Sequence, residues 1–150
     1  MIRPAFVPRD PGFAARVEAS FGRQAFMGHL GVELAHVGPG EVDLVVPFHK
    51  GLIQQHGYFH AGVAATIADS AAGYAALSLF APGTGILTTE FKINFLAPAR
   101  GEKLVARGCA IKSGRTLTVC QSDVTALSDG TETMIATGLF TLMQVEGLED

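Results

Sequence analysis

The sequence predicts a single α+β domain in which a curved antiparallel sheet of about six strands wraps one long apolar helix. The helix comes from residues 60–80, HAGVAATIADSAAGYAALSLF, which are apolar nearly all round and must therefore be covered nearly all round. The sheet comes mainly from the C-terminal half, where apolar and polar residues alternate with a period of two. No linker divides the 150 residues, which fit one domain of common size.

The segment before the long helix is expected to form a short helix and a hairpin. Apolar residues recur at roughly helical spacing between residues 12 and 27, and we predict an amphipathic helix there. Residues 1–28 then form an N-terminal extension, and residues 29–146 form the core of the domain. The turn residues Gly38, Pro39 and Gly40 separate two extended runs within residues 31–47, which predicts the hairpin.

The remaining strands follow the long helix. Residues 48–59 are polar and irregular and lead into this helix, and the run from Pro82 to Gly85 ends it, because proline and glycine do not continue a helix cheaply. The period of two in the later segments excludes a helix bundle. We expect strands at residues 87–95, 102–112, 115–127 and 133–145, with turns at 97–101, 113–114 and 128–130.

Charge and hydropathy exclude several classes of partner. The charged fraction is 17%, against a usual ~25%, which suggests that part of the surface is buried between subunits. The net charge is −3 and the pI is about 5.9, so no basic excess points to nucleic acid or to an anionic membrane. The apolar helix is not expected to span a membrane either, because its central Asp69 would cost ~2.5–3.5 kcal/mol on insertion.

Two cysteines, Cys109 and Cys120, lie in neighbouring strand segments, where a cross-strand disulfide is one option. The N-terminal residues contain three prolines and no apolar h-region, so they do not read as a secretory signal. We therefore expect both thiols to be reduced and the protein to be cytoplasmic.

Asp69 is the residue that most directly indicates chemistry. It is the only carboxylate between residues 60 and 80, and no Lys or Arg occurs there. A buried carboxylate costs several kcal/mol unless it is paired, hydrogen-bonded or neutralised. It is either a core carboxylate held by donors, a residue facing a solvated seam, or a base or nucleophile strengthened by apolar surroundings.

The start of the same helix offers backbone donors. Ala61 and Gly62 have small side chains, so their N–H groups stay approachable, and a helix N-terminus carries partial positive charge. Such donors suit a developing oxyanion, although small residues also serve close packing. His60 either caps or orients the helix start, or it lines a substrate site with His56.

Other motifs are weaker. The spacing of His56 and His60 resembles a metal-binding pair, but no Glu follows His56 and Gly57 disfavours a helix, so no metal site is expected. Gln54 and Gln55 precede the helix, where a Gln either belongs to an ordinary loop or holds a water or a carbonyl. The sequence contains no phosphate-binding loop, dinucleotide fingerprint or serine-nucleophile elbow.

The spacing of Ala61 and Asp69 predicts a site that is shared by two chains. The two residues are eight apart on one helix, which separates them by ~12 Å along its axis. One substrate carbonyl cannot lie within ~3 Å of both groups. Two antiparallel helices from facing subunits would bring Ala61 of one copy near Asp69 of the other. We therefore predict a two-fold homodimer with two equivalent interface sites.

The segment QQHGYFHAGVAATIADSAAGYAA resembles the signature of hotdog-fold acyl-CoA thioesterases of the phenylacetate-degradation (PaaI-like) type, and TEFKINFLAPARGEKLVARG resembles the strand and turn that follow in that family. The likeness covers roughly residues 31–145 and departs from the family at HAG, where the family has HGG. By position, Asp69 matches the catalytic carboxylate and Ala61 matches the residue whose amide binds the thioester oxygen, with His60 before it. Gln54 matches an Asn or Gln that contacts water or the carbonyl, and Thr88 falls near a Ser or Thr that assists from the partner side.

The resemblance implies hydrolysis of a medium-chain or aryl acyl-CoA to the free acid and CoA, with no cofactor beyond the CoA of the substrate. The homodimer follows from the spacing of Ala61 and Asp69, and a tetramer built as a dimer of dimers stays open because exposed sheet faces or edges could pair two dimers. A hotdog hydratase or dehydratase acting on acyl thioesters and a non-catalytic acyl-CoA-binding module are the alternatives. Candidates for binding the substrate are Gly62, Thr88, Gln55 and His56, and candidates for the CoA phosphates are Arg100 and Arg115, with Lys103 and Lys112 as further basic residues.

Overall fold

The computed structural model describes residues 5–148 and contains one curved sheet and three α-helices in that range. The helices are α1 (Phe13–Arg23), α2 (Ala25–Leu30) and α3 (Ala61–Leu77), with a turn of 3-10 helix at Lys50–Leu52. The strands are β1 (Glu33–Gly38), β2 (Glu41–Pro47), β3 (Thr84–Phe95), β4 (Lys103–Ser113), β5 (Leu117–Ser128) and β6 (Thr131–Glu146).

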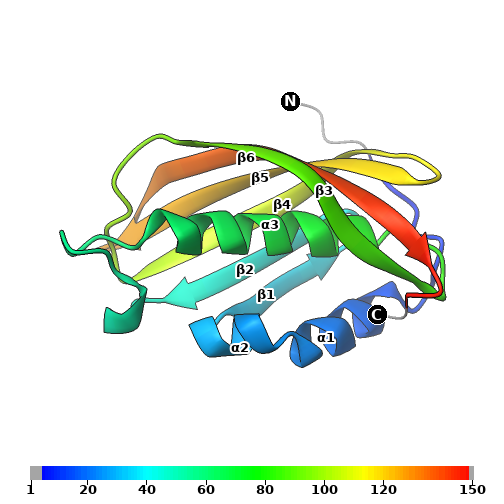
Figure 1. The fold of residues 1–150 in the computed structure, drawn as a ribbon, viewed down its shortest axis with the longest axis horizontal. Coiled ribbons are helices and arrows are strands. Elements are labelled where there is room, and N and C mark those ends of the chain that lie inside the picture. The colour runs from blue at the N-terminus through cyan, green and yellow to red at the C-terminus, as the bar shows by residue number, and fades with distance from the viewer. Residues whose placement is uncertain (1–4, 149–150) are drawn as a thin grey trace.

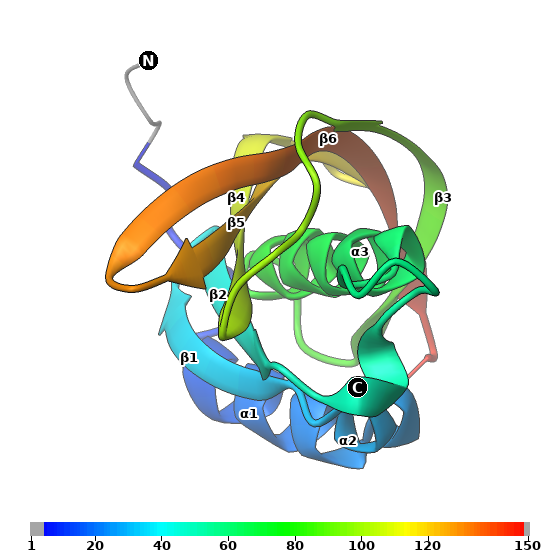
Figure 2. The same ribbon diagram turned by 90° about the vertical axis from the view of Figure 1, so that its left-hand side faces the viewer.

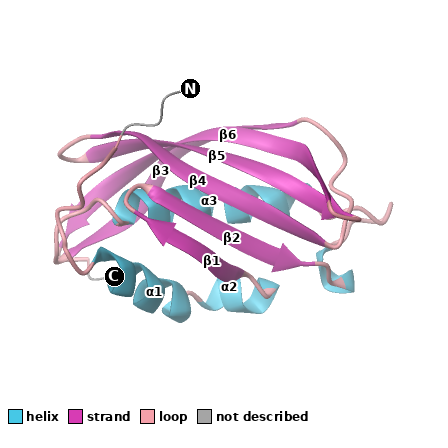
Figure 3. Cartoon of the chain, turned by 180° about the vertical axis from the view of Figure 1, so that it is seen from behind, coloured by secondary structure: helices cyan, strands magenta, loops and turns pink. Residues whose placement is uncertain are grey.

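The six strands form one antiparallel sheet in the order β1-β2-β4-β5-β6-β3. The sheet curves around α3, which lies in its hollow (Figures 1 and 2). Seen from behind, the sheet lies in front of α3, and α1 and α2 follow the β1 edge (Figure 3). This arrangement confirms the predicted α+β hotdog fold, with one helix packed against a six-stranded sheet.

Small residues let the helix approach the sheet closely. Ala71 and Ala72 of α3 are fully buried, and a Cβ added to Gly108 of β4 would lie 2.3 Å from the carbonyl carbon of Ala71. A methyl group at position 108 would therefore push the two elements apart. On β2 the alternating pattern does mark the core, since Val42 and Leu44 are fully buried.

Strand β3 departs from that pattern. Its apolar residues Leu87, Phe91 and Phe95 alternate with polar ones but are about half exposed, because β3 lies at the edge of the sheet.

The N-terminal segment departs from the sequence-based prediction. Residues 12–27 were expected to form one helix, whereas the chain forms α1 and α2 with a break at Gln24, where ψ is 95°. Val17 and Met27 are both buried but are ten residues apart. The break changes the direction of the chain so that both side chains reach the core. One straight amphipathic helix would place these two side chains against the core less directly.

Cys109 and Cys120 are not joined by a disulfide. Ala110 is the residue that pairs with Cys120 across the β4–β5 ladder, so the two cysteines occupy positions that point to opposite faces of the sheet. Burial raises the pKa of the Cys120 thiol to about 12, which keeps it protonated. Among residues 5–148, no helix is both long and apolar enough to cross a membrane.

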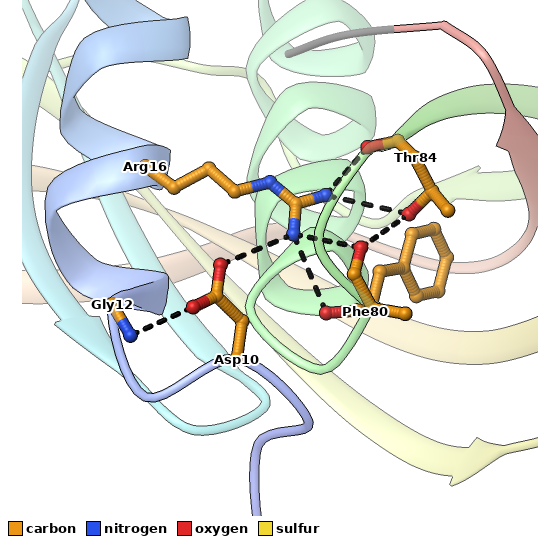
Figure 4. A network of polar contacts seen from close by, with 6 residues as sticks. Asp10, Gly12, Arg16, Phe80 and Thr84 are labelled. Carbon is orange, nitrogen blue, oxygen red and sulfur yellow. Dashed lines mark hydrogen bonds and ion pairs between the residues drawn. The ribbon is translucent and has the colours of Figure 1, made fainter.

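Arg16 of α1 ties the N-terminal extension to the end of α3 (Figure 4). Its guanidinium donates to the carbonyl oxygens of Ala81 (3.0 Å) and Thr84 (2.5 Å) and, at 3.4 Å, to that of Phe80. Asp10 lies 3.5 Å away and holds the start of α1 by accepting the Gly12 N–H at 2.8 Å. One charged side chain thus satisfies carbonyl groups where the long helix ends.

Substituting Arg16 should therefore loosen this end of the molecule. We expect Arg16→Ala to lower the free energy of unfolding by about 2–3 kcal/mol, because it removes charge-assisted hydrogen bonds and leaves carbonyl groups unsatisfied. Urea unfolding measures the change. Arg23→Ala, at the exposed last turn of the same helix, is the matched control and should cost little. Equal losses for the two variants would contradict the role of Arg16.

Candidate active site

Asp69 lies on the flank of α3 that faces β3 and α1. Its carboxylate is half-buried, and the Thr88 hydroxyl of β3 donates to Asp69 Oδ1 at 2.8 Å. Burial raises the pKa of Asp69, and the hydrogen bond from Thr88 opposes part of that rise. The carboxylate opens onto a pocket of about 150 Å³. The pocket is lined by Ser20, Gln24, Asp69, Ser70, Gly73, Tyr74, Ile86 and Thr88.

The start of α3 leaves one backbone amide available. His60 is the N-cap, and its ring nitrogen Nδ1 accepts the Gly62 N–H at 2.8 Å, so the neutral ring carries its proton on Nε2. The next helical amide, Val63 N–H, donates to the His60 carbonyl at 2.9 Å. Within residues 5–148 the Ala61 N–H has no acceptor. The Ala61 N–H can therefore donate a hydrogen bond to a group outside the helix, as an oxyanion donor must.

The departure from the HGG motif is sterically acceptable. Asp129 is the only non-glycine residue with positive φ in the described range, so Ala61 adopts an ordinary backbone conformation that does not require glycine. Position 62 is different, because a Cβ there would lie 2.9 Å from His60 Nδ1. A side chain at position 62 would therefore force the capping ring of His60 to shift, whereas the amide at position 61 tolerates alanine.

Gln54 lies beside Ala61, as its predicted role requires. Gln54, His60 and Ala61 line an open depression of about 610 Å³ whose other wall contains Phe95 and Leu96. The Gln54 side-chain oxygen accepts the N–H of His56, which closes the loop. Gln55 and His56 are exposed on that loop, and they are not among the described residues that line this depression. The structure therefore brings Gln54 to Ala61 and leaves Gln55 and His56 outside.

The two predicted phosphate-binding arginines lie at opposite ends of the sheet. Arg100 lines a second depression, of about 520 Å³, which shares Phe59 and Ala99 with the depression at Ala61. Arg115 follows the other end of the 11-residue strand β4, which places it ~33 Å from the Arg100 end. Of these two arginines, Arg100 is the one whose depression adjoins the start of α3 within one chain.

Ala61 and Asp69 do not meet within one chain. Ala61 belongs to the depression at the start of α3, whereas Asp69 belongs to the pocket beside α1, and these two cavities share no lining residue. Thr88, expected near a residue that assists from the partner side, contacts Asp69 of its own chain. The helical separation of ~12 Å that follows from the sequence therefore persists in the fold.

Six residues that line the Asp69 pocket were not predicted from the sequence as site residues. Ser20 and Gln24 come from the N-terminal extension, whereas Ser70, Gly73 and Tyr74 come from α3 and Ile86 comes from β3. Nothing local marks the first two, because their proximity to Asp69 arises from the packing of α1 beside α3. Among residues 5–148, no group of three or more His, Cys, Asp or Glu side chains is close enough to hold a metal ion.

Comparison with known proteins identifies the family. The model of the family described as Thioesterase superfamily matches residues 56–133, just over half of the sequence, and the chain belongs to that family. A crystal structure of a Thioesterase family protein from Silicibacter pomeroyi is 47% identical, with a TM-score of 0.89, and the match covers 91% of this chain and 100% of that one. This membership makes the chain a thioester hydrolase.

More distant structures share the fold alone. A thioesterase from Haemophilus influenzae is 22% identical with a TM-score of 0.77, over 98% of this chain and 96% of that one. The PaaI protein from the phenylacetic acid degradation operon of E. coli is 18% identical with a TM-score of 0.80, over 90% of this chain and 94% of that one. PaaI is thus one of several structural neighbours, and the family level is what the matches establish.

The cap at His60 predicts different effects for two glycine-to-alanine substitutions. Gly62→Ala should have a free energy of unfolding about 1 kcal/mol below that of Gly28→Ala, because the new methyl group displaces the capping ring and this offsets the gain in helix propensity. Gly28→Ala, in the exposed part of α2 with nothing within 4 Å of its Cβ position, should raise the free energy of unfolding by up to ~1 kcal/mol. Thermal and urea unfolding measure both. A Gly62→Ala protein as stable as Gly28→Ala would contradict the cap.

The raised pKa of Asp69 predicts a pH-dependent stability difference. Because the pKa is higher in the folded state, the contribution of Asp69 to stability is fully present below its unfolded pKa of ~3.9 and is lost as the pH rises through the folded value. Asp69→Asn should therefore be more stable than the native protein at pH 7, and this advantage should shrink towards pH 3.5. Urea unfolding at several pH values measures the difference.

Glu132 provides the contrasting control. Arg107 donates to both of its carboxylate oxygens at 2.8 Å, and these hydrogen bonds lower the pKa of Glu132. Its stabilising contribution is present above its unfolded pKa and is lost as the pH falls through the folded value. Glu132→Gln should thus be less stable than the native protein at pH 7, with a gap that closes in acid. Parallel pH profiles for the two variants would contradict the assignment for Asp69.

Proposed function

We propose that this chain hydrolyses a medium-chain or aryl acyl-CoA to the free acid and CoA, in the manner of PaaI-like thioesterases, at two equivalent sites of a two-fold dimer. One observation carries the proposal: an available amide, Ala61 N–H, and a half-buried carboxylate, Asp69, lie on one helix but in separate cavities. A single thioester carbonyl can use both groups only if they come from two chains.

The open flank of α3 supports a close helix–helix contact. Ala61, Ala65, Asp69 and Gly73 follow one another at intervals of four residues, and all are exposed or partly exposed. Residues at this spacing lie on one face of a helix, and small side chains allow two backbones to approach. An antiparallel second copy packed along this face would place its Ala61 beside the Asp69 of the first chain.

Strand β3 supports the same dimer. It pairs with β6 along one edge, and no described strand pairs with its other edge over 12 residues. Leu87, Phe91 and Phe95 of this strand are about half exposed, at 49%, 48% and 50%. A long apolar edge is a template for pairing with another chain. A second copy that paired along β3 and covered α3 would bury both surfaces, in agreement with the low charged fraction.

The proposed reaction uses two groups on opposite sides of the carbonyl. The Ala61 N–H, at the positive end of α3, donates to the thioester oxygen and stabilises the oxyanion that develops there. Asp69 of the other chain, oriented by Thr88, either takes a proton from water as water attacks or attacks the carbonyl carbon itself. The carbon–sulfur bond breaks, the CoA thiolate leaves and takes up a proton, and water supplies the oxygen of the acid.

The remaining polar residues surround this reaction. Gln54 is placed to hold a water or the carbonyl near Ala61, and Arg100 is placed to bind a CoA phosphate at the adjoining depression. Arg115 is too far from this end of its own chain to bind the same CoA molecule, so it would contribute only from a second copy. A dimer of dimers would leave this arrangement unchanged.

A complementation experiment tests the shared site. Ala61→Pro removes the amide hydrogen while keeping the helix, because proline is favoured at the first helical position and His60, at φ −62° and ψ 138°, already has the conformation required before proline. Asp69→Asn removes the carboxylate. Each variant alone should lose about a hundredfold or more of the CoA-thiol release. Co-refolded in equal amounts, the two should recover about a quarter of native activity, because half of the dimers then contain one intact site.

The outcomes separate the alternatives. No recovery in the mixture, with folding and dimer formation intact, would rule out a site shared between chains. Full activity of Asp69→Asn would rule out the catalytic role of Asp69. With an enoyl thioester, loss of the enoyl absorbance without thiol release would indicate a hydratase, and tight binding without any turnover would indicate a binding module. Light scattering distinguishes a dimer from a tetramer.

A further inference from the structure

The pocket beside Asp69 has a wall from outside the core of the fold. Helix α1 runs antiparallel along α3, since Arg16 binds the carbonyl of Phe80 and the Ser20 hydroxyl lies 3.5 Å from the Tyr74 hydroxyl. Gln24, one turn beyond Ser20, therefore lies further toward Asp69. The three walls of the pocket are α1 with the junction at Gln24, α3, and β3. The N-terminal extension thus encloses space that would otherwise be open.

The pocket has an exposed mouth and a closed end, and most of its lining residues are polar along its whole length. Asp69, Thr88 and the exposed Gln24 lie at the mouth, where the thioester would react. Ser20 and Tyr74 lie at the closed end and are 6% and 5% exposed. Their hydroxyl groups contact each other across it, and the Phe21 ring packs edge-on against Tyr74 with the ring centres 5.8 Å apart. This end is therefore held by packing from α1.

The dimensions limit what the pocket can accept. Its volume is about 150 Å³, the size of a protein cavity that holds one benzene ring. Tyr74 is five residues beyond Asp69 on α3, which gives a depth of ~7.5 Å along the helix axis. The ion-paired anchor of Arg16 holds α1 in place, so a longer group could extend past the closed end only by displacing Ser20 or Tyr74.

We propose that this pocket receives the acyl group and that Ser20 of α1, together with Tyr74, sets the maximum acyl length at about six carbon atoms or one ring. This inference rests on the proposed function, because it assumes that Asp69 acts on the thioester at the mouth of the pocket. It assigns the N-terminal extension a direct role in specificity. Among the medium-chain and aryl acyl groups that the proposed function leaves open, it favours the shorter chains and groups with a single ring.

A chain-length series tests the proposal with two variants that act in opposite directions. The substrates are acetyl-CoA, hexanoyl-CoA, phenylacetyl-CoA and decanoyl-CoA, and thiol release gives kcat/KM for each. The native protein should prefer hexanoyl-CoA or phenylacetyl-CoA to decanoyl-CoA. Ser20→Leu fills the closed end and should lower kcat/KM for these two preferred substrates about tenfold or more, while acetyl-CoA changes less than about twofold. Tyr74→Leu should raise the decanoyl-to-hexanoyl ratio at least about fivefold.

Controls keep the test decisive. Arg23→Leu adds the same side chain to the exposed last turn of α1, outside the pocket, and should leave the ranking of substrates unchanged. Ser20→Val replaces Ser20→Leu if the larger side chain prevents folding. A ranking led by decanoyl-CoA, or one that neither Ser20 nor Tyr74 variants alter, would overturn the acyl-length proposal. If Asp69→Asn loses activity under the same conditions, the proposed function stands even where the acyl-length proposal fails.

Discussion

The burial of α3 is the constraint on which the rest of the structure depends. A helix composed mainly of alanine and other apolar residues gains stability only when most of its surface is removed from water, and the curved sheet provides that cover. Close approach at Gly108 allows the sheet to bend around it. The sheet nevertheless ends at β3, and one flank of the helix stays accessible. The carboxylate that could not be buried without cost lies on that flank.

Local hydrogen bonds decide which groups on α3 stay available for chemistry. His60 uses its ring to satisfy Gly62, which leaves the amide of Ala61 without an acceptor in the described chain. Thr88 supplies a single side-chain donor to Asp69, enough to orient the carboxylate but not enough to cancel the effect of burial on its pKa. The helix therefore carries a hydrogen-bond donor, the Ala61 N–H, at its start and a carboxylate of raised pKa, Asp69, near its middle. Their separation supports an assembly of two chains.

The N-terminal extension covers part of α3 and also forms one wall of the pocket beside Asp69. Its break at Gln24 and its anchor at Arg16 place α1 along the accessible flank, between the end of α3 and the pocket beside Asp69. Ser20 and Gln24 line that pocket, whereas Val17 and Met27 of the same extension are part of the core. In the proposed reaction, the residues of the extension that line the pocket are the ones suited to adjust which acyl groups are accepted.

The sequence by itself determined the secondary structure of the core and singled out Ala61 and Asp69, the two groups that the proposed reaction uses. Alternation of period two predicted each strand to within a few residues, and the apolar run with one carboxylate predicted both α3 and Asp69, since these signals are carried by neighbouring residues. The tertiary structure alone decided the bond between Thr88 and Asp69, the accessible edge of β3, the break at Gln24 and the presence of Ser20 at the site. These features depend on contacts between residues 19 to 54 positions apart, or on the packing of whole elements, and a local pattern carries no record of them.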